Sequence, residues 1–265
     1  MKKNALIGFS GFVGGTLLKQ ASFDFLYRST NIKEIDGRDF GFVFCASAPA
    51  QKWIANKNPQ KDRENILSII ERLKNIKCEN FILISTVDVF KTPVGVDELT
   101  LVEEDGLHAY GFNRRLLEKF VQENFSKHLI VRIPGLVGPG LRKNIIFDFL
   151  NKNNLHMIES RGVFQFYPMV NIWHDIQIAL REGLQLVHLT AEPISVAEIS
   201  LEGFGRPFVQ NINSVPAIYD VQTIYADLFG SSGRYQYSVR ETIQAIRCYA
   251  QSEYVNSKNK AGDES

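Results

Sequence analysis

Residues Ala5–Gln20, with the sequence ALIGFSGFVGGTLLKQ, decide the expected fold. Gly8, Gly11 and Gly14 follow an apolar run and precede a short segment with a helical pattern. A dinucleotide pyrophosphate must approach backbone N–H groups at a helix N-terminus, where side chains would block it. The spacing therefore predicts a strand, a tight turn and a helix that bind a dinucleotide. The contacts expected along this turn come from Gly8, Ser10, Gly11, Phe12, Val13 and Gly14.

The first half of the chain alternates between two kinds of segment. Buried strands are predicted from runs rich in Phe, Ile and Val at residues 4–9, 23–27, 40–46, 81–86 and 129–135. Amphipathic helices are predicted at 59–76, where Pro59 suits the first turn, and at 109–125. Strand–helix alternation favours an α/β fold of the Rossmann type, with a doubly wound, mainly parallel sheet.

The pattern changes after about residue 135. A turn-rich GPGLRKN segment is followed by short mixed strands and helices, and the last ten residues are polar. We expect one Rossmann-type domain over residues 1–265. Its cofactor-binding core would cover about 1–135, a small substrate lobe about 136–255, and a frayed tail 256–265.

Composition argues against several classes of partner. The chain of 265 residues has a net charge of +1 and no Lys- or Arg-rich tract, so neither nucleic acid nor an acidic membrane is indicated. Three scattered cysteines show no metal-ligand spacing, which favours reduced thiols in a cytoplasmic protein without a metal. Glycines interrupt the first apolar run, so we expect neither an export signal nor a membrane span.

The end of the second predicted strand bears on the choice of cofactor. NAD-specific sites usually place Asp or Glu there, whereas an arginine attracts the 2′-phosphate of NADP. This chain has Arg28 and Ser29 at that place, and Asp24 lies too early to serve as the ribose carboxylate. We therefore expect NADP rather than NAD, although an arginine at the end of a strand is also a common surface residue.

Five motifs in order resemble the extended short-chain dehydrogenases/reductases, the group of sugar-nucleotide epimerases, dehydratases and reductases. They are GFSGFVG at residues 8–14, FVFCASAPA at 42–50, ISTVDVF at 84–90, YGFNR at 110–114 and RIPGLVGPGLRKN at 132–144. The later YPMVNIWHDIQIAL segment is also similar to a strand–helix of the family. The resemblance spans most of the chain. It implies a Rossmann fold, a nicotinamide cofactor and a substrate similar to a nucleotide sugar.

The resemblance also implies roles for individual residues. Thr86 would hydrogen-bond the reacting oxygen, and Tyr110, 24 positions later, would donate or accept its proton. Arg114 stands where the family has a lysine. Further cofactor contacts would come from Ala46, Ser47, Ala48 and Pro134, together with Tyr110 and Arg114.

An arginine in place of that lysine changes the expected chemistry. A cation one helical turn from a phenol favours the phenolate and lowers its pKa. Arginine keeps the charge and donates hydrogen bonds, but it does not release a proton and its planar head is placed differently. The same residues are also consistent with an ordinary amphipathic helix, in which Tyr110 packs inward and Arg114 is solvated.

Substrate contacts are predicted less directly. Asp88 could be an additional acid, Arg142 could meet a diphosphate, and Gln165 and Tyr167 could line one face of a cleft. The alternatives are that Asp88 caps a loop, that Arg142 is solvated, and that Gln165 and Tyr167 form one face of a strand.

These observations predict NAD(P)-dependent chemistry on a carbonyl or hydroxyl carbon of a small molecule, which the resemblance identifies with an activated sugar. A smaller carbonyl compound is an alternative substrate. The resemblance also implies a homodimer. The alternative is a cofactor-binding protein with weak or no catalysis that acts as a regulatory or structural subunit. A scaffold that binds no cofactor is a third hypothesis.

Overall fold

The computed structural model describes residues 2–213 and 215–261, and the chain divides into two compact units. The first unit contains residues 2–92, 98–133 and 172–188, and the second contains the described parts of 93–97, 134–171 and 189–261. The chain therefore crosses between the units several times. The segment 172–188, expected in the substrate lobe, belongs to the first unit.

The strands of the first unit are β1 (Ala5–Ile7), β2 (Phe25–Tyr27), β3 (Asp39–Cys45), β4 (Lys77–Thr86), β6 (His128–Ile133) and β10 (Leu186–His188). Its α-helices are α1 (Phe12–Gln20), α2 (Lys52–Lys57), α3 (Pro59–Leu73), α4 (Ala109–Asn124) and α6 (Ile172–Arg181). Short 3₁₀ turns occur at η1 (Ile32–Ile35) and η2 (Val87–Val89).

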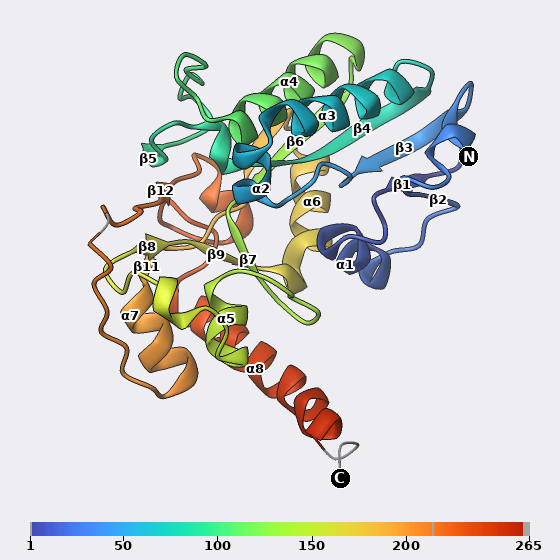
Figure 1. Cartoon of the computed structure of the whole chain (residues 1–265). Coiled ribbons are helices and arrows are strands. Elements are labelled where there is room, and N and C mark those ends of the chain that lie inside the picture. The colour runs from blue at the N-terminus through green and yellow to red at the C-terminus, as the bar shows by residue number, and fades with distance from the viewer. Residues whose placement is uncertain (1, 214, 262–265) are drawn as a thin grey trace. The chain divides into compact units, whose positions relative to one another are not determined.

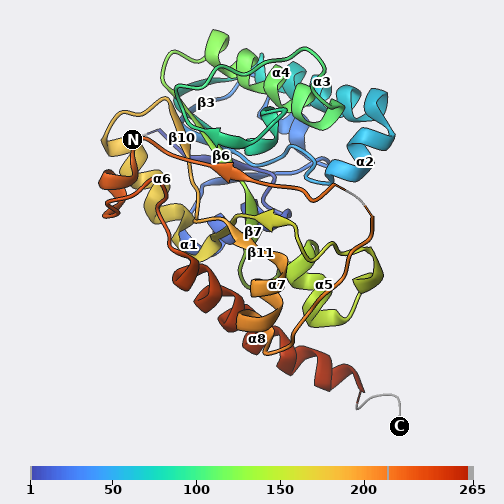
Figure 2. The same cartoon turned by 90° about the vertical axis from the view of Figure 1, so that its left-hand side faces the viewer.

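The six strands form one sheet in the order β10-β6-β4-β3-β1-β2, and every pair in it is parallel. Helices α3 and α4 lie side by side on one face of this sheet, and α1 and α6 cover the other (Figures 1 and 2). The doubly wound α/β fold is confirmed, and each predicted strand of the first half falls on an observed one.

The strand order creates a switch point in the sheet. From β1 the chain moves outward to β2, and it then returns to place β3 on the other side of β1. Only η1 separates β2 from β3, so the FVFCASAPA segment at 42–50 forms the end of the third strand along the chain and the loop that follows it. Ligands of open α/β sheets bind outside the carboxyl ends of strands at such a point. The topology therefore places the candidate site beyond β1 and β3.

Local sequence explains the two long helices over the sheet. Pro59 begins α3, and the apolar side chains of Ile66, Ile70 and Leu73 pack into the core. The backbone N–H of Gly111 donates to Nδ1 of His108, which caps α4 at 3.0 Å. The observed ends, Leu73 and Asn124, lie within three residues of the predicted ones.

A buried ion pair connects α4 to the sheet. Glu118 on α4 and Arg132 on β6 are almost completely buried, and Arg132 donates from Nε and Nη2 to the two carboxylate oxygens at 3.0 and 2.7 Å. Ser85 donates to the same carboxylate at 2.6 Å. Burial would raise the pKa of Glu118, but Arg132 and these hydrogen bonds hold it below its ordinary range.

The strands of the second unit are short: β5 (Val94–Val96), β7 (Gly135–Val137), β8 (Val163–Phe164), β9 (Phe166–Pro168), β11 (Ile194–Ser195) and β12 (Asp220–Val221). They pair two by two, as β7 with β9, β8 with β11 and β5 with β12. Its α-helices are α5 (Ile145–Asn151), α7 (Val196–Glu198) and α8 (Val239–Ala261). The remaining turns are η3 (Leu155–Met157), η4 (Met169–Asn171), a π-helical turn η5 (Ile199–Gly203) and η6 (Ala226–Phe229).

Part of the predicted tail, residues 256–265, is helical in the structure. Helix α8 continues through Ala261, so the backbone of residues 256–261 is helical. Residues 262–265 lie outside the described part of the chain.

Replacing Arg132 with Met is expected to lower the free energy of unfolding by about 3–5 kcal/mol, because the Glu118 carboxylate would stay buried without its main counterion. Arg115→Met is the matched control. Arg115 also contacts Glu118, at 3.0 Å, but from a partly exposed position, and its loss should cost about 1 kcal/mol or less. Urea denaturation measures both values, and equal losses would contradict this ranking.

Candidate functional site

The glycine turn brings two strand ends into backbone contact. Gly8 has φ +89°, and a Cβ built on it would lie 2.5 Å from the carbonyl oxygen of Ala46. A Cβ on Gly14 would overlap the backbone of Gly8. Neither position therefore has room for a side chain. The turn beyond β1 packs directly against the segment that follows β3.

The first turn of α1 fits a phosphate group. Gly11 is the N-cap, and no side chain caps the helix. Ser10 and Gly11 are exposed beside it. The N–H groups of the first helical turn have no acceptor within the helix, so those of Phe12 and Val13 can hold a pyrophosphate between two nucleotides. On this observation the residues present fit a dinucleotide.

The residues expected beside the adenine ribose lie near the same turn. The guanidinium carbon of Arg28 lies 5.8 Å from the ring centroid of Phe9, and Arg28 Nε donates to Thr30 at 3.0 Å. Arg28 and Ser29 are both exposed. Asp24 instead accepts a hydrogen bond from the backbone N–H of Asn4, at the opposite end of β2. A positive charge therefore stands at the end of β2.

Residues Ala46, Ser47 and Ala48 form the half-buried segment after β3. The N–H of Ala46 donates to the carbonyl oxygen of Ile7 at 2.9 Å, which continues the pairing of β1 with β3. Ser47 Oγ lies 3.3 Å from Cys45 Sγ. This segment therefore borders the glycine turn, as expected for a cofactor contact, and Pro134 belongs to the second unit.

Thr86 and Tyr110 come together, as the resemblance implies. Thr86 ends β4, and Tyr110 lies in the first turn of α4, where its N–H donates to Asn56 Oδ1 at 2.9 Å. The Thr86 side chain lies close enough to the phenol to lower its pKa, and both residues are 7% exposed. Ser85, next to Thr86, points instead to the buried Glu118. Thr86 is thus the hydroxyl at the end of β4 that meets the tyrosine.

Arg114 lies against the face of the Tyr110 ring and is not solvated. Its guanidinium carbon is 3.9 Å from the ring centroid, and its side chain is 2% exposed. Nη1 donates to Asp62 and, at 3.2 Å, to the carbonyl oxygen of Tyr110, and Nη2 donates to the carbonyl oxygen of Pro49. The alternative of an ordinary solvated arginine is therefore wrong.

Asp62, which no motif in the sequence marks, is the buried partner of Arg114. It lies on α3, is 5% exposed, and accepts from Asn113 at 2.8 Å as well as from Arg114. A buried guanidinium needs a carboxylate partner, because an uncompensated charge in the interior is costly. The only available signal was a polar residue within the first turn of the predicted helix, which is a common place for aspartate. The Asp62–Arg114 pair therefore joins α3 to α4 beneath the tyrosine.

The pKa of the Tyr110 phenol is raised above its ordinary value of 10.0. Burial is the largest cause, and the nearby Asp88 carboxylate adds to it. The Arg114 charge, the hydrogen bond with Thr86 and Lys52 act in the opposite direction. The expected effect of Arg114 is present, but the expectation that the pKa falls overall is wrong because burial outweighs it.

Asp88 is paired with a basic residue from another element. Its Oδ1 lies 2.7 Å from Nζ of Lys52, at the start of α2. Burial and then Lys52 lower the pKa of His108, the cap of α4, which favours its neutral form. No pattern in the sequence marks Lys52, since one lysine in a loop-like stretch carries no periodic signal.

The substrate residues expected in the second unit are placed differently. Arg142 is exposed after the Gly-Pro-Gly turn. Gln165 is 1% exposed, and its Nε2 donates to the carbonyl oxygens of Ala191 and Val221 at 2.7 and 2.8 Å. Tyr167 is fully buried and meets the ring of Tyr237 edge-on. The expectation that Gln165 and Tyr167 line a cleft is wrong, because both side chains are buried in the interior of this unit.

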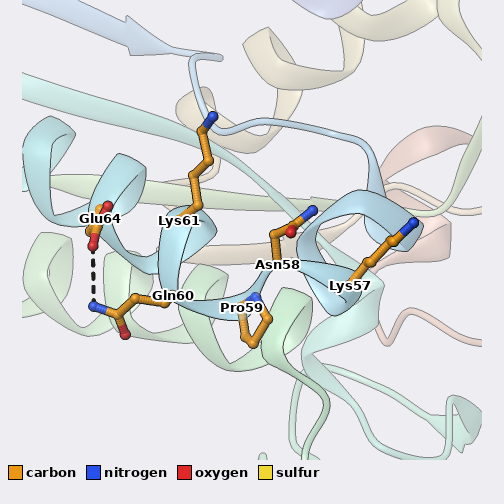
Figure 3. A pocket seen from close by; sticks show the side chains of 6 residues that line it. All are labelled: Lys57, Asn58, Pro59, Gln60, Lys61 and Glu64. Atoms are coloured by element: carbon orange, nitrogen blue, oxygen red, sulfur yellow. Dashed lines mark hydrogen bonds between the residues drawn. The ribbon is translucent and has the colours of Figure 1, made fainter.

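A shallow hollow lies where α2 meets α3, apart from any predicted residue. Figure 3 shows its lining, which consists of Lys57, Asn58, Pro59, Gln60, Lys61 and Glu64. All six are exposed, and Gln60 donates to Glu64 at 3.2 Å. The hollow lacks a cluster of groups suited to catalysis.

Across 2–213 and 215–261, no group of three or more His, Cys, Asp or Glu side chains is arranged to hold a metal ion. Among the helices of the same residues, none is long and apolar enough to cross a bilayer.

Known proteins resemble the chain in structure alone. No protein-family model matches it, and no curated protein matches its sequence. UDP-galactose 4-epimerase superposes with a TM-score of 0.70 at 14% identity, covering 96% of this chain and 99% of that one. RMD from Pseudomonas aeruginosa, solved with NADPH, gives 0.71 at 13% identity, with coverage of 95% and 99%. MoeE5, solved with UDP-glucose and NAD, gives 0.68 at 17% identity, with coverage of 95% and 99%. At these identities the likeness shows a shared fold.

Arg114→Met is expected to lower the free energy of unfolding by about 3–5 kcal/mol, because Asp62 would remain buried without its counterion. Arg114→Lys should cost less, about 1–3 kcal/mol, since an ammonium keeps the charge but cannot reproduce the fork of donors. Adding Asp62→Asn to Arg114→Met should recover part of the loss in a double-mutant cycle followed by urea denaturation. Arg63→Met, on α3 beside the ring of Phe112, is the control, and a strictly additive cycle would contradict the coupling.

Proposed function

We propose that this chain, which has the fold of the extended short-chain dehydrogenases/reductases, is an NAD(P)-dependent oxidoreductase or epimerase. It would act on a carbonyl or hydroxyl carbon. One observation carries the proposal. The glycine turn after β1 and the Thr86–Tyr110 pair after β4 both lie at the carboxyl edge of the same parallel sheet. Parallel strands end at one edge, so a dinucleotide bound at the turn would extend along the edge on which the phenol stands.

The residues of the first unit support a particular way of holding the cofactor. The N–H groups of Phe12 and Val13 and the hydroxyl of Ser10 would take the pyrophosphate, and Gly8, Gly11 and Gly14 keep the approach open. Arg28 and Ser29 would meet the 2′-phosphate, which favours NADP over NAD. The segment Ala46–Ala48 would border the cofactor, and a contact from Pro134 stays a prediction.

The bound nicotinamide would supply the hydride acceptor or donor. Tyr110 would give a proton to the reacting oxygen, or take one from it, and Thr86 would orient that oxygen through its hydroxyl. The raised pKa keeps the phenol protonated at neutral pH, so its proton is available for transfer to a carbonyl oxygen during reduction. Arg114 would act from the face of the ring as a fixed charge. A contact from Arg114 to the cofactor ribose stays a prediction, because two of its nitrogens already bind protein groups.

An activated sugar is the substrate class that the comparisons favour. The similar structures include a UDP-galactose epimerase and a protein bound to UDP-glucose. Arg142 is exposed and could meet a diphosphate, and Asp88 borders the phenol. A homodimer and a cytoplasmic location stay predictions.

The hydrogen bonds of Arg114 to protein groups favour a second possible function. In it, the protein binds the cofactor but catalyses weakly or not at all. The Arg114 guanidinium is committed to Asp62 and to the Pro49 carbonyl oxygen. A phenol with a raised pKa is almost fully protonated at neutral pH, so Tyr110 is also a poor base there. The two functions differ in turnover. NADPH consumption across nucleotide sugars and small carbonyl compounds would support the enzyme, whereas thermal stabilisation by NADPH without turnover would support the binding protein.

Arg28→Ala is expected to weaken NADPH binding about tenfold and NADH binding about twofold or less, because only NADPH carries the 2′-phosphate. Isothermal titration and thermal shift measure both. Lys19→Ala, at the far end of α1, removes one exposed charge and should leave both affinities unchanged. Equal weakening for the two cofactors would remove the preference for NADP, and no stabilisation of the unmodified protein by either would refute the proposed function.

Tyr110→Phe is expected to lower kcat by roughly 10²–10⁴-fold, because the proton donor is lost while the ring still packs on Arg114. The dissociation constant for NADPH should stay within about twofold. Tyr27→Phe is the control, since the buried Tyr27 hydroxyl has no hydrogen-bond partner and its removal should leave turnover intact. Undiminished turnover of the Tyr110 variant would refute the mechanism.

A further inference from the structure

A second cation, besides Arg114, acts on the phenol. Lys52 begins α2, and its Nζ is 2.7 Å from Asp88 Oδ1. The side chain of Lys52 is 37% exposed and that of Asp88 is 17% exposed. Arg114 and Asp62 are 2% and 5% exposed. The site therefore has one buried ion pair and one that reaches solvent.

The exposed pair is connected to the phenol through Thr86. The backbone N–H of Asp88 donates to Thr86 Oγ1 at 3.1 Å, and Thr86 Oγ1 lies 3.5 Å from Asp88 Oδ2. Thr86 in turn lies close enough to the phenol to lower its pKa. Lys52, Asp88, Thr86 and Tyr110 therefore lie in one cluster that reaches solvent at Lys52.

The charges that face Tyr110 come from three places. Arg114 stands over the ring on α4, Asp88 lies in the turn after β4, and Lys52 reaches in from α2. The His108 ring centroid is 6.3 Å from that of Tyr110, and the neutral form of this imidazole is favoured. Asp88 and Lys52 act on the phenol with opposite sign. Removing either would leave the other uncompensated beside it.

We propose that Lys52 is a positioning residue of this site, whose ammonium holds the Asp88 carboxylate against Thr86 and supplies the solvent-accessible positive charge that acts on Tyr110. The inference rests on the proposed function for its catalytic meaning. Arg114 is fixed by its buried partner Asp62, whereas the partly exposed Lys52–Asp88 pair can be broken by solvent or by a ligand. The Lys52–Asp88 pair therefore adjusts the acidity of the phenol, whereas the effect of the Arg114 charge on that acidity stays constant.

The test follows the titration of Tyr110 in cofactor-free protein labelled with 3-fluorotyrosine, whose phenol is more acidic, with Tyr110→Phe to assign the ¹⁹F signal. Lys52→Met should move the titration of Tyr110 to higher pH, and Asp88→Asn should move it to lower pH. The double variant should lie between them. Lys57→Met is the matched control on α2, since Lys57 lines the exposed hollow of Figure 3, and it should change nothing.

Turnover supplies the second readout. In the direction in which the phenolate accepts the proton, Lys52→Met should lower kcat about tenfold at neutral pH and move the pH profile upward, with KM for the cofactor unchanged. Lys52→Arg should restore most of the rate. If the pair were merely structural, Lys52→Met and Asp88→Asn would both lower kcat, and the titration of Tyr110 would not shift in opposite directions.

The outcomes separate the two claims. An unmoved Tyr110 titration in Lys52→Met, or shifts of equal sign in Lys52→Met and Asp88→Asn, would overturn the inference whatever the turnover. Opposite shifts together with no turnover on any substrate would support the coupling of the pair to the phenol and refute the proposed enzymatic function.

Discussion

The contact between the turn after β1 and the chain after β3 is the constraint on which the rest of this structure depends. Gly8 and the carbonyl of Ala46 approach so closely that no side chain fits between them, and Gly14 packs on Gly8 in the same way. This contact holds two neighbouring strand ends together at the switch point and leaves the first amides of α1 uncapped. A side chain at either glycine would separate the strands or displace the helix, and the proposed anion site would be lost with it.

The edge of the sheet next to this contact holds the polar groups of the site. Thr86 is placed by the end of β4, whose neighbour Ser85 is turned inward by the buried Glu118–Arg132 pair. Tyr110 is placed by the start of α4, which His108 caps. Because β4, β6 and α4 all contribute to one buried ion network, the position of the hydroxyl near the phenol depends on packing well behind the site.

Arginine in place of a lysine changes how charge is distributed around the phenol. A guanidinium has more donors than an ammonium, and in the interior each needs an acceptor. Asp62, the Pro49 carbonyl oxygen and the Tyr110 carbonyl oxygen provide acceptors for two of its nitrogens, while Nε has none. The cation is thus immobilised against the ring. The solvent-accessible charge of the site comes from Lys52, on a different helix.

Local pattern in the sequence determined much of the fold. The glycine spacing, the apolar runs and the amphipathic helices predicted the parallel sheet and the turn, because each depends on residues close together in the chain or on a regular period. The Thr86–Tyr110 pair was implied by the family resemblance of the motifs. Burial and long-range pairing were decided only by the tertiary structure. Asp62 is 52 positions from Arg114 and Lys52 is 36 from Asp88, and no periodicity links them. Gln165 and Tyr167 alternate as an exposed strand face would, yet packing in the second unit buries both. The pKa of Tyr110 was also decided by the tertiary structure. It depends on how far the fold removes water from the phenol, which the sequence does not specify.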